Sequence, residues 1–215
     1  EVLGSARTWR ALGQTLAQAA AGTALSVVLG VPAAFVLYRL RFRGRAALRG
    51  LLTVPFVLPT VVVAVAFRAV FGPGGPLAFL GIDGSFVIIV LALAFFNVTV
   101  VMRTVGGFWA QLDARPEQAA SCLGASPARV WWTVTLPALT PAIASAAALV
   151  FLFCATSFGI VLVLGGREFQ TIETEIYRLT VQYLDLRGAA VLSILQLVIV
   201  AAAIGVAVIV FMSAL

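Results

Sequence analysis

The chain has 215 residues, of which 62% are hydrophobic and only 10% are charged, so it is far too apolar for a soluble domain of this size. Its formal net charge is +6, and every basic residue is an arginine, most of which lie beside apolar stretches rather than on a polar face. This pattern indicates an integral membrane protein and argues against nucleic-acid binding. The sequence contains no histidine, which excludes histidine-based triads, histidine metal sites and histidine proton relays.

The first predicted span runs from Ala11 to Tyr38 and is long enough to cross about 30 Å of hydrocarbon, which takes about 20 residues. Five arginines follow it within eleven residues, with no acid among them: Arg39, Arg41, Arg43, Arg45 and Arg49. This excess of positive charge predicts that the loop is cytoplasmic. We expect contact with phospholipid headgroups there, and a specific regulatory site is the alternative for the same arginines.

Two further spans are predicted, from Leu51 to Phe71 and from Ser85 to Trp109. Pro55 and Pro59 remove two backbone donors from the second span and bend it, either to line a pathway or as a packing feature. The connection between the two spans, residues 72–84, is rich in turn residues and has no basic residue. It is therefore predicted to face outward.

A fourth span is predicted from Leu136 to Val163, and polar side chains interrupt both it and the third span. Asn97 and Thr99 lie within the third span, and Thr156 and Ser157 lie in the outer half of the fourth. Polar groups in hydrocarbon need partners, so these four residues are candidates for a translocation path. Interhelical hydrogen bonding is the alternative for the same side chains.

Residues 165–187 form the longest polar stretch on the outer side, with four acids against three arginines. Apolar residues recur in it at helical spacing: Ile172, Ile176, Leu179 and Tyr183. This spacing predicts an amphipathic helix that lies at the outer surface.

The fifth span, from Ala189 to Met212, returns to the cytoplasm. Five alternating spans predict an all-α membrane protein in which residues 1–215 form a single transmembrane domain. The two cysteines are expected to stay unpaired, because Cys122 belongs to a polar loop and Cys154 to an apolar span at a different depth.

A short polar break, residues 113–137, separates the third and fourth spans and is predicted to form two small helices joined by a turn. Pro116 suits a first helical turn, and Gly124 stands where a helix ends in a left-handed residue. Ser126 and Pro127 then restart a helix as its cap and its first position. An ordinary cytoplasmic loop is the alternative interpretation of this break.

The spacing within the break resembles a signature of permease subunits of ATP-binding-cassette importers, Glu-Ala-Ala…Gly…Ile-x-Leu-Pro. Gln118-Ala119-Ala120 is followed after three residues by Gly124, and then at the same spacing by Val134 and Leu136-Pro137. The resemblance implies a coupling helix that docks into a cytoplasmic ATPase, formed by these loop residues: Glu117, Gln118, Ala119, Ala120, Leu123, Gly124, Ser126, Pro127, Leu136 and Pro137. The family's glutamate falls on Gln118, with Glu117 one residue earlier, and which of the two takes its role is left open.

The resemblance further implies the type I importer permease fold, with five core spans and the coupling helix between the third and fourth. It implies these partners in a bacterial inner membrane: two copies of the ATPase, an extracytoplasmic substrate-binding protein and a second permease half, fused or separate. ATP and magnesium would be bound by the ATPase, so no catalytic site and no cofactor are expected in this chain. A resemblance to the first half of thiamine permeases, which fuse two such halves in one polypeptide, implies that residues 1–215 are one half of a longer two-repeat polypeptide, and this would explain the start at Glu1 and the abrupt end at Leu215.

Several segments look like the thiamine and ferric-iron branch of that superfamily: residues 42–45, 95–98, 157–159, 164–166, 171–173, 176–177 and 187–190. The resemblance implies thiamine as the solute, with ferric iron or an inorganic anion such as sulfate as alternatives. Glu173, Glu175 and Tyr177 are then candidate contacts for the binding protein. The two acids could also steer a cationic solute, or form an ordinary solvated face.

Three other classes of function fit the sequence less well than an importer. A secondary transporter would place ionisable groups within its spans for ion coupling, and no carboxylate lies within a predicted span. An intramembrane protease would need a base or a pair of carboxylates there, and the spans contain neither. A structural membrane subunit without ATP coupling fits the composition, and only the resemblance of the coupling loop disfavours it.

Overall fold

The computed structural model describes residues 4–166 and 169–213, and the regular structure of these residues is helical throughout. In chain order the helices are α1 (Ala6–Ala34), α2 (Arg45–Val57), α3 (Thr60–Phe71), α4 (Phe86–Trp109), α5 (Arg115–Cys122), α6 (Pro127–Val130), α7 (Leu136–Ala155), α8 (Gly159–Leu164), α9 (Ile172–Tyr177) and α10 (Leu186–Ser213). Three π-helical turns follow α1, α6 and α9: Phe35–Arg39, Trp131–Thr135 and Arg178–Gln182. A 3₁₀ turn, Ala78–Leu80, interrupts the loop between α3 and α4.

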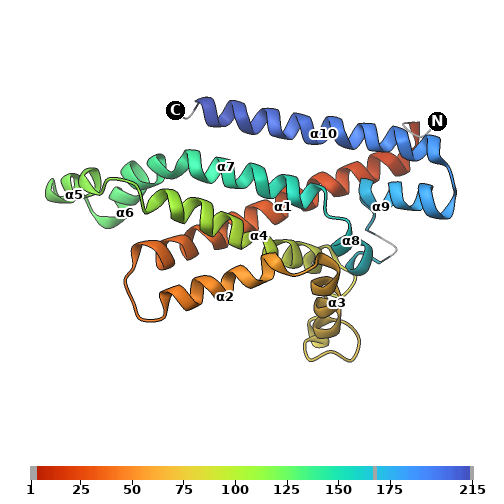
Figure 1. Cartoon of the computed structure of the whole chain (residues 1–215), viewed down its shortest axis with the longest axis horizontal. Helices are drawn as coiled ribbons and strands as arrows, with labels where there is room; N and C mark the ends of the chain where they lie inside the picture. The colour runs from red at the N-terminus through yellow and green to blue at the C-terminus, as the bar shows by residue number, and fades with distance from the viewer. Residues whose placement is uncertain (1–3, 167–168, 214–215) are drawn as a thin grey trace.

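Helices α1, α4 and α7 form the centre of the bundle, and α10 packs along α7 (Figure 1). Close contact between α1 and α4 depends on small residues. A Cβ atom added to Gly30 would lie 2.6 Å from the Cβ of Val101, so any larger residue would push the two helices apart. Ile88, Leu93 and Val101 of α4 are fully buried in this centre.

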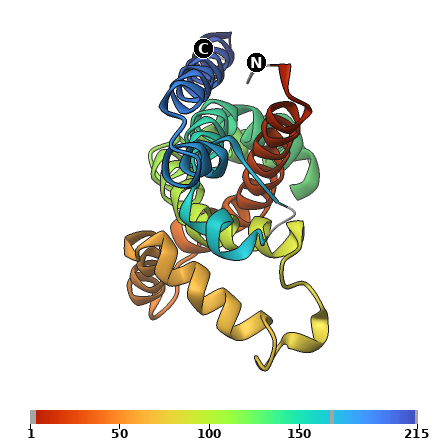
Figure 2. The same ribbon diagram turned by 90° about the vertical axis from the view of Figure 1, so that its right-hand side faces the viewer.

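The second span is sharply broken rather than gently bent. Helices α2 and α3 meet at an angle of 101° across Leu58 and Pro59. Pro55 lies inside α2 and Pro59 precedes α3, so the predicted loss of backbone donors has its effect at this point. Figure 2 shows α3 pointing away from the bundle instead of continuing along it.

The fourth span differs from its predicted bounds of 136–163. It starts earlier, because α6, its π-helical turn and α7 form one continuous helix, Pro127–Ala155. It also ends earlier, because Thr156 leaves helical geometry and its hydroxyl donates to the carbonyl of Leu152 at 2.9 Å. Residues 159–164 form α8, which packs against α3 rather than prolonging the span.

The predicted outer helix is present but shorter, and its buried face differs from the prediction. Ile172 is buried as expected, whereas Tyr183 is exposed and Glu175 is buried. The π-helical turn Arg178–Gln182 adds one residue to the helical register, which moves Tyr183 off the apolar face.

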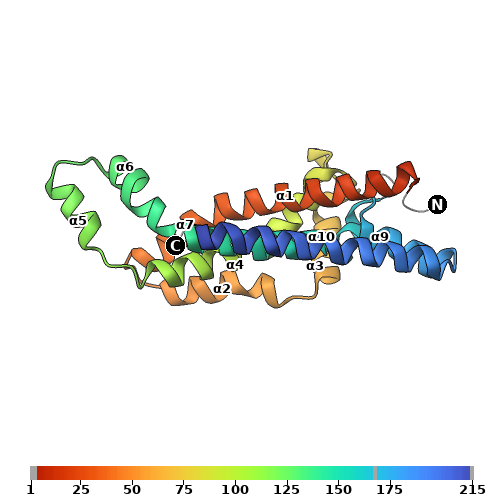
Figure 3. The same cartoon turned by 90° about the horizontal axis from the view of Figure 1, so that it is seen from above.

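Among the residues that the structure describes, four helices are long and apolar enough to cross a membrane, and a fifth span is obtained when α2 and α3 are counted together. The predicted five-span, all-α fold is thus confirmed. The arginine-rich connection between α1 and α2 lies at the same end of the bundle as α5 and α6, and α9 lies at the opposite end (Figure 1). Seen from above, α5 and α6 extend beyond the bundle (Figure 3).

Candidate functional site

The loop between α4 and α7 forms two short helices, as predicted. Pro116 lies in the first turn of α5, and Gly124 follows it with a φ of +84°. Ser126 caps α6, where its hydroxyl accepts a hydrogen bond from the backbone N–H of Arg129 at 3.3 Å. A Cβ atom on Gly124 would meet nothing within 4 Å, so backbone conformation rather than space requires glycine here.

One face of α5 is open to solvent. The side chain of Leu123, at its end, is 89% exposed, and Gln118 and Ala119 are exposed as well. A protruding leucine beside a small alanine suits insertion into the groove of a partner. Gln118, Ala119 and Leu123 therefore share one accessible surface, whereas Ala120 is half-buried, and contact of this surface with an ATPase stays a prediction.

Glu117 points in the opposite direction, toward the spans. Its carboxylate is paired with Arg39 at the end of the first span, and it accepts a hydrogen bond from the hydroxyl of Thr135 at 2.8 Å. The side chains of Arg39 and Glu117 are 27% and 23% exposed, so this ion pair is partly shielded from water. Glu117 therefore connects α5 to the ends of two spans, and Gln118 is left facing outward.

A cluster of aromatic side chains packs next to this ion pair. The ring of Trp109 at the end of α4 lies 5.5 Å from those of Phe35 and Trp131, and the guanidinium of Arg39 lies 5.9 Å from it. A cavity of about 840 Å³ lies between the coupling loop and this cluster. The aromatic cluster thus joins the ends of the first, third and fourth spans next to the Arg39–Glu117 ion pair.

Sequence reasoning missed Arg39 and Thr135 as partners of the coupling loop. The sequence places Arg39 with its neighbours in a cluster expected to set membrane orientation and to contact headgroups, although it is the arginine that directly ends the first span. Arg45 and Arg49 also donate to backbone carbonyls, of Leu40 and Leu37, while Arg41 and Arg43 are exposed. Headgroup contact by the cluster stays a prediction.

A second cavity, of about 400 Å³, lies where the α2–α3 break meets the α7–α8 break, and we call it the break cavity. Three of the four predicted pathway residues line it: Asn97, Thr156 and Ser157. Thr60, at the start of α3, lines it too and was missed. Thr99 does not line it, because its hydroxyl donates to the carbonyl of Leu52 and ties α4 to α2.

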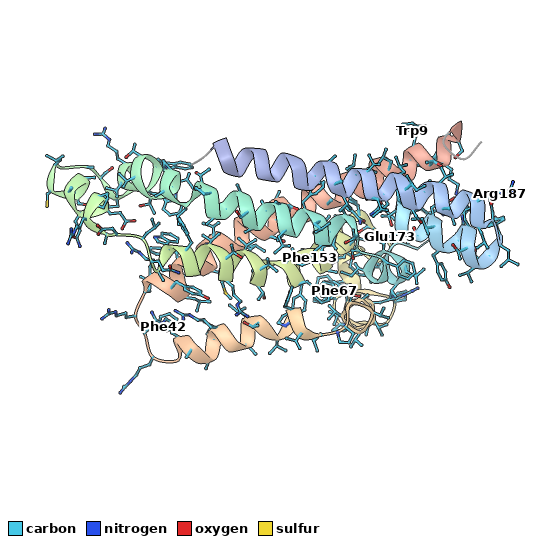
Figure 4. All side chains as sticks on the ribbon, turned by 45° about the horizontal axis from the view of Figure 1, so that its top comes forward. Trp9, Phe42, Phe67, Phe153, Glu173 and Arg187 are labelled. Carbon is cyan, nitrogen blue, oxygen red and sulfur yellow. The ribbon has the colours of Figure 1, made fainter. Side chains whose placement is uncertain are left out.

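Asn97 and Phe153 shape the break cavity from the two central helices. Asn97 is only 3% exposed, and its amide nitrogen donates to the carbonyl of Leu93 at 2.8 Å. Its Oδ1 has no hydrogen-bond partner among the described residues. Phe153 of α7 reaches toward α2, where its ring lies 6.2 Å from that of Phe56 (Figure 4). Within the described part of the chain, no charged side chain lines this cavity.

The candidate contacts for a binding protein lie in three different settings. Glu175 is 5% exposed and forms ion pairs with Arg178 and, at 3.3 Å, with Arg7. Its carboxylate is engaged inside the protein, so the steering role expected of it finds no support. Tyr177 is exposed and its ring lies 5.3 Å from that of Phe158, and its contact with a binding protein stays a prediction.

Glu173 is half-buried near the outer ends of α7 and α10 (Figure 4). Its Oε1 accepts a hydrogen bond from the side-chain nitrogen of Gln196 at 3.3 Å. Burial raises the pKa of the Glu173 carboxyl above its ordinary value, because the charged form loses hydration. Glu173 therefore joins α9 to α10 through this hydrogen bond and does not form a freely solvated acidic face.

Comparison with known proteins of similar sequence places these features in a family. Residues 26–215 match the family described as binding-protein-dependent transport system inner membrane component. The molybdenum transport system permease protein ModB of Mycobacterium tuberculosis is 39% identical over 193 residues, which cover 86% of this chain and 72% of that protein. The thiamine transport system permease protein ThiP of Escherichia coli is 34% identical over 200 residues, covering 88% of this chain and 37% of ThiP.

Solved structures of ABC transporters share this fold. A bacterial ABC transporter involved in alginate import superposes with a TM-score of 0.79 at 17% identity, covering 99% of this chain and 80% of the other. The MetNI methionine ABC transporter gives a TM-score of 0.76 at 15% identity, covering 97% and 96%. The chain therefore belongs to the binding-protein-dependent transport system inner membrane components, as a multi-pass permease that moves a small solute while ATP is hydrolysed by a partner ATPase.

Proposed function

We propose that this permease imports molybdate. The observation that carries the proposal is the 39% identity with molybdenum permeases over 193 residues. The ModB protein of Azotobacter vinelandii is 31% identical over 177 residues, and the sulfate permease CysT of Escherichia coli is 31% identical over 175. Molybdate and sulfate are both tetrahedral dianions, so these relatives point to one shape and one charge of solute.

Charge within the protein supports an anion over a cation. The break cavity has no acidic side chain among its described lining residues, and such an acid would repel a dianion and attract a cation. On the outer side, Glu175 is neutralised by Arg178 and Arg7 and cannot attract a cationic solute. These features remove the electrostatic reason for expecting thiamine or ferric iron.

Thiamine remains the second candidate because of the 34% identity with ThiP over 200 residues. The two relatives differ in length: the match to this chain covers 72% of ModB but only 37% of ThiP. A molybdate permease of the ModB kind would take a separate second chain as its other half, whereas the ThiP kind would fuse both halves. We favour a separate second half over the fused polypeptide expected from the sequence.

The partners proposed for this function are two copies of a cytoplasmic ATPase, bound through the α5 face around Leu123, and a substrate-binding protein at the α9 end. The test uses the complete importer in liposomes, reconstituted from this permease, its second half, the ATPase and the binding protein. We expect uptake of molybdate and tungstate that requires ATP and the binding protein, with no uptake of thiamine. ATP-dependent thiamine uptake without molybdate uptake would overturn the proposal.

A further inference from the structure

Two chain breaks, far apart in the sequence, meet at the break cavity. The first separates Val57 from Thr60 and the second separates Ala155 from Gly159. A Cβ atom on Gly159 would lie 2.9 Å from Oγ1 of Thr60, so the two breaks are in direct contact. Irregular backbone at this depth is tolerated where it lines a cavity, and both breaks line this one.

The α3 side of the cavity supplies hydrogen-bond donors and partial positive charge. Helix α3 has 12 residues, and Pro59 precedes it without any side-chain cap. The first N–H groups of a helix have no partner within it, and they carry the positive end of the helix dipole. Thr60 and Val61, at this end, both line the cavity. A helix N-terminus of this kind favours an anion with several acceptor oxygens.

The opposite wall supplies a hydroxyl and a buried amide. Ser157, in the second break, adds a hydroxyl to that of Thr60, whereas the hydroxyl of Thr156 is already bonded to Leu152. Asn97 is held by its bond to Leu93, with its Oδ1 lacking a partner among the described residues. A buried acceptor without a donor is costly, so a water molecule in the cavity would be needed to donate to this oxygen.

We infer that the break cavity is a transit subsite for a tetrahedral oxyanion. The α3 N-terminus and the hydroxyls of Thr60 and Ser157 donate to its oxygens, and Asn97 accepts a hydrogen bond from a water molecule that accompanies it. This inference rests on the proposed function, since it takes the transported solute to be an oxyanion. Because the described lining holds no arginine, the subsite binds weakly enough to release the anion, as transport requires.

The test compares the complete importer in liposomes with the double variant Thr60→Val, Ser157→Ala, which removes both hydroxyls and keeps side-chain volume nearly unchanged. Molybdate uptake and ATP hydrolysis stimulated by the loaded binding protein are both measured. We expect uptake to fall about tenfold or more, as the loss of two donors to a charged ligand implies, while stimulated hydrolysis stays within about twofold. The matched control is Thr140→Val, whose exposed hydroxyl donates within α7 at 3.0 Å and lies outside the cavity.

The outcomes separate the subsite from the function. Normal molybdate uptake by the double variant would overturn the subsite and leave the molybdate permease intact. Failure of the unaltered importer to move molybdate would overturn the proposed function, and the subsite with it. Equal loss of uptake and of stimulated hydrolysis would contradict the subsite, because it would assign the hydroxyls to coupling.

A second measurement does not depend on turnover. Ser157→Cys in a Cys122→Ser background places a thiol in the cavity, while the native Cys154 is fully buried. Modification by a sulfonate-bearing methanethiosulfonate reagent is followed by mass spectrometry in the assembled importer. We expect molybdate to slow modification at least about fivefold, and thiamine to have no effect. Thr140→Cys serves as the control, and an equal rate with and without molybdate would overturn the subsite.

Discussion

The two candidate sites of this permease differ in how they use charge. At the cytoplasmic end, Glu117 and Arg39 form an ion pair next to the aromatic cluster, so the coupling loop is attached firmly to the spans. In the break cavity, the described lining is neutral and Asn97 keeps an unpartnered oxygen. The charged site suits a permanent connection that transmits movement, and the neutral site suits a solute that must leave again.

The largest expected effect comes from reversing charge in the coupling loop. Glu117→Arg places two cations together at a partly shielded position and removes the acceptor of Thr135. We expect the attachment of the coupling loop to the spans to be weakened by about 2 kcal/mol. If coupling falls in proportion, ATP-driven uptake drops roughly 30-fold. The measurement is uptake at matched membrane expression.

The double variant Arg39→Glu, Glu117→Arg should recover part of that loss, since the pair is restored in reverse. The control is the same exchange at Asp113 and Arg115, a pair 3.9 Å apart whose side chains are 63% and 89% exposed. Such an exposed pair contributes little, so its exchange should leave uptake unchanged. Equal effects at both pairs would contradict the special role of Glu117.

Adding charge to the neutral site should have the next largest effect. Asn97→Asp introduces a carboxylate beside the path of a dianion, and we expect molybdate uptake to fall at least about tenfold. Asn97→Leu removes the amide without adding charge and should cost less. Uptake that is equally reduced in both variants would show that the loss comes from packing rather than from electrostatic repulsion.

Gly124→Val tests the turn that ends the coupling helix. Its φ of +84° is costly for a β-branched residue, by about 1–2 kcal/mol, so we expect stimulated ATP hydrolysis to fall several-fold. Gly107→Val is the comparison, because a Cβ there also meets nothing within 4 Å but its backbone is helical. Normal uptake and hydrolysis with Gly124→Val at normal expression would refute the prediction.

The smallest expected effect concerns Glu173, which is half-buried and whose pKa is raised by the loss of hydration of its charged form. Because its pKa is raised in the folded protein, the folded state binds its proton more tightly than the unfolded chain does. Its contribution to stability is therefore present below the ordinary pKa of 4.5 and is lost as pH rises through the raised value. Glu173→Gln should match the natural protein in Tm near pH 4 and exceed it by a few degrees at pH 7. A constant difference across this range would exclude the carboxyl as the cause.

The local form of the coupling loop could be predicted from the sequence because its signals are local. A proline in the first turn, a left-handed glycine and a serine cap each act within a few residues, and all three are present as expected. The span boundaries were less predictable. Apolar composition continues through Thr156 to Val163, so hydropathy does not show that α8 leaves the fourth span to pack against α3.

The contacts of the sites depended on tertiary structure. Asn97, Thr156 and Ser157 were identified as polar residues in apolar surroundings, but their meeting with Thr60 requires the 101° break that brings α3 to α8. Arg39 and Glu117 are 78 residues apart, so no local pattern connects them. Glu175 is a candidate surface contact in the sequence but is buried in the structure, because Arg7, distant in the chain, and the nearby Arg178 pair with its carboxylate.

The two partners of Glu117 lie in the same kind of helical turn. Arg39 and Thr135 each lie in a π-helical turn, which holds one residue more than an α-helical turn. Deleting one residue from 35–39 or from 131–135 would turn the following residues by about 100° and carry the partner away from Glu117. The alignment of the coupling loop therefore depends on the number of residues in two spans, so a one-residue insertion or deletion there would change it without altering any residue of the loop.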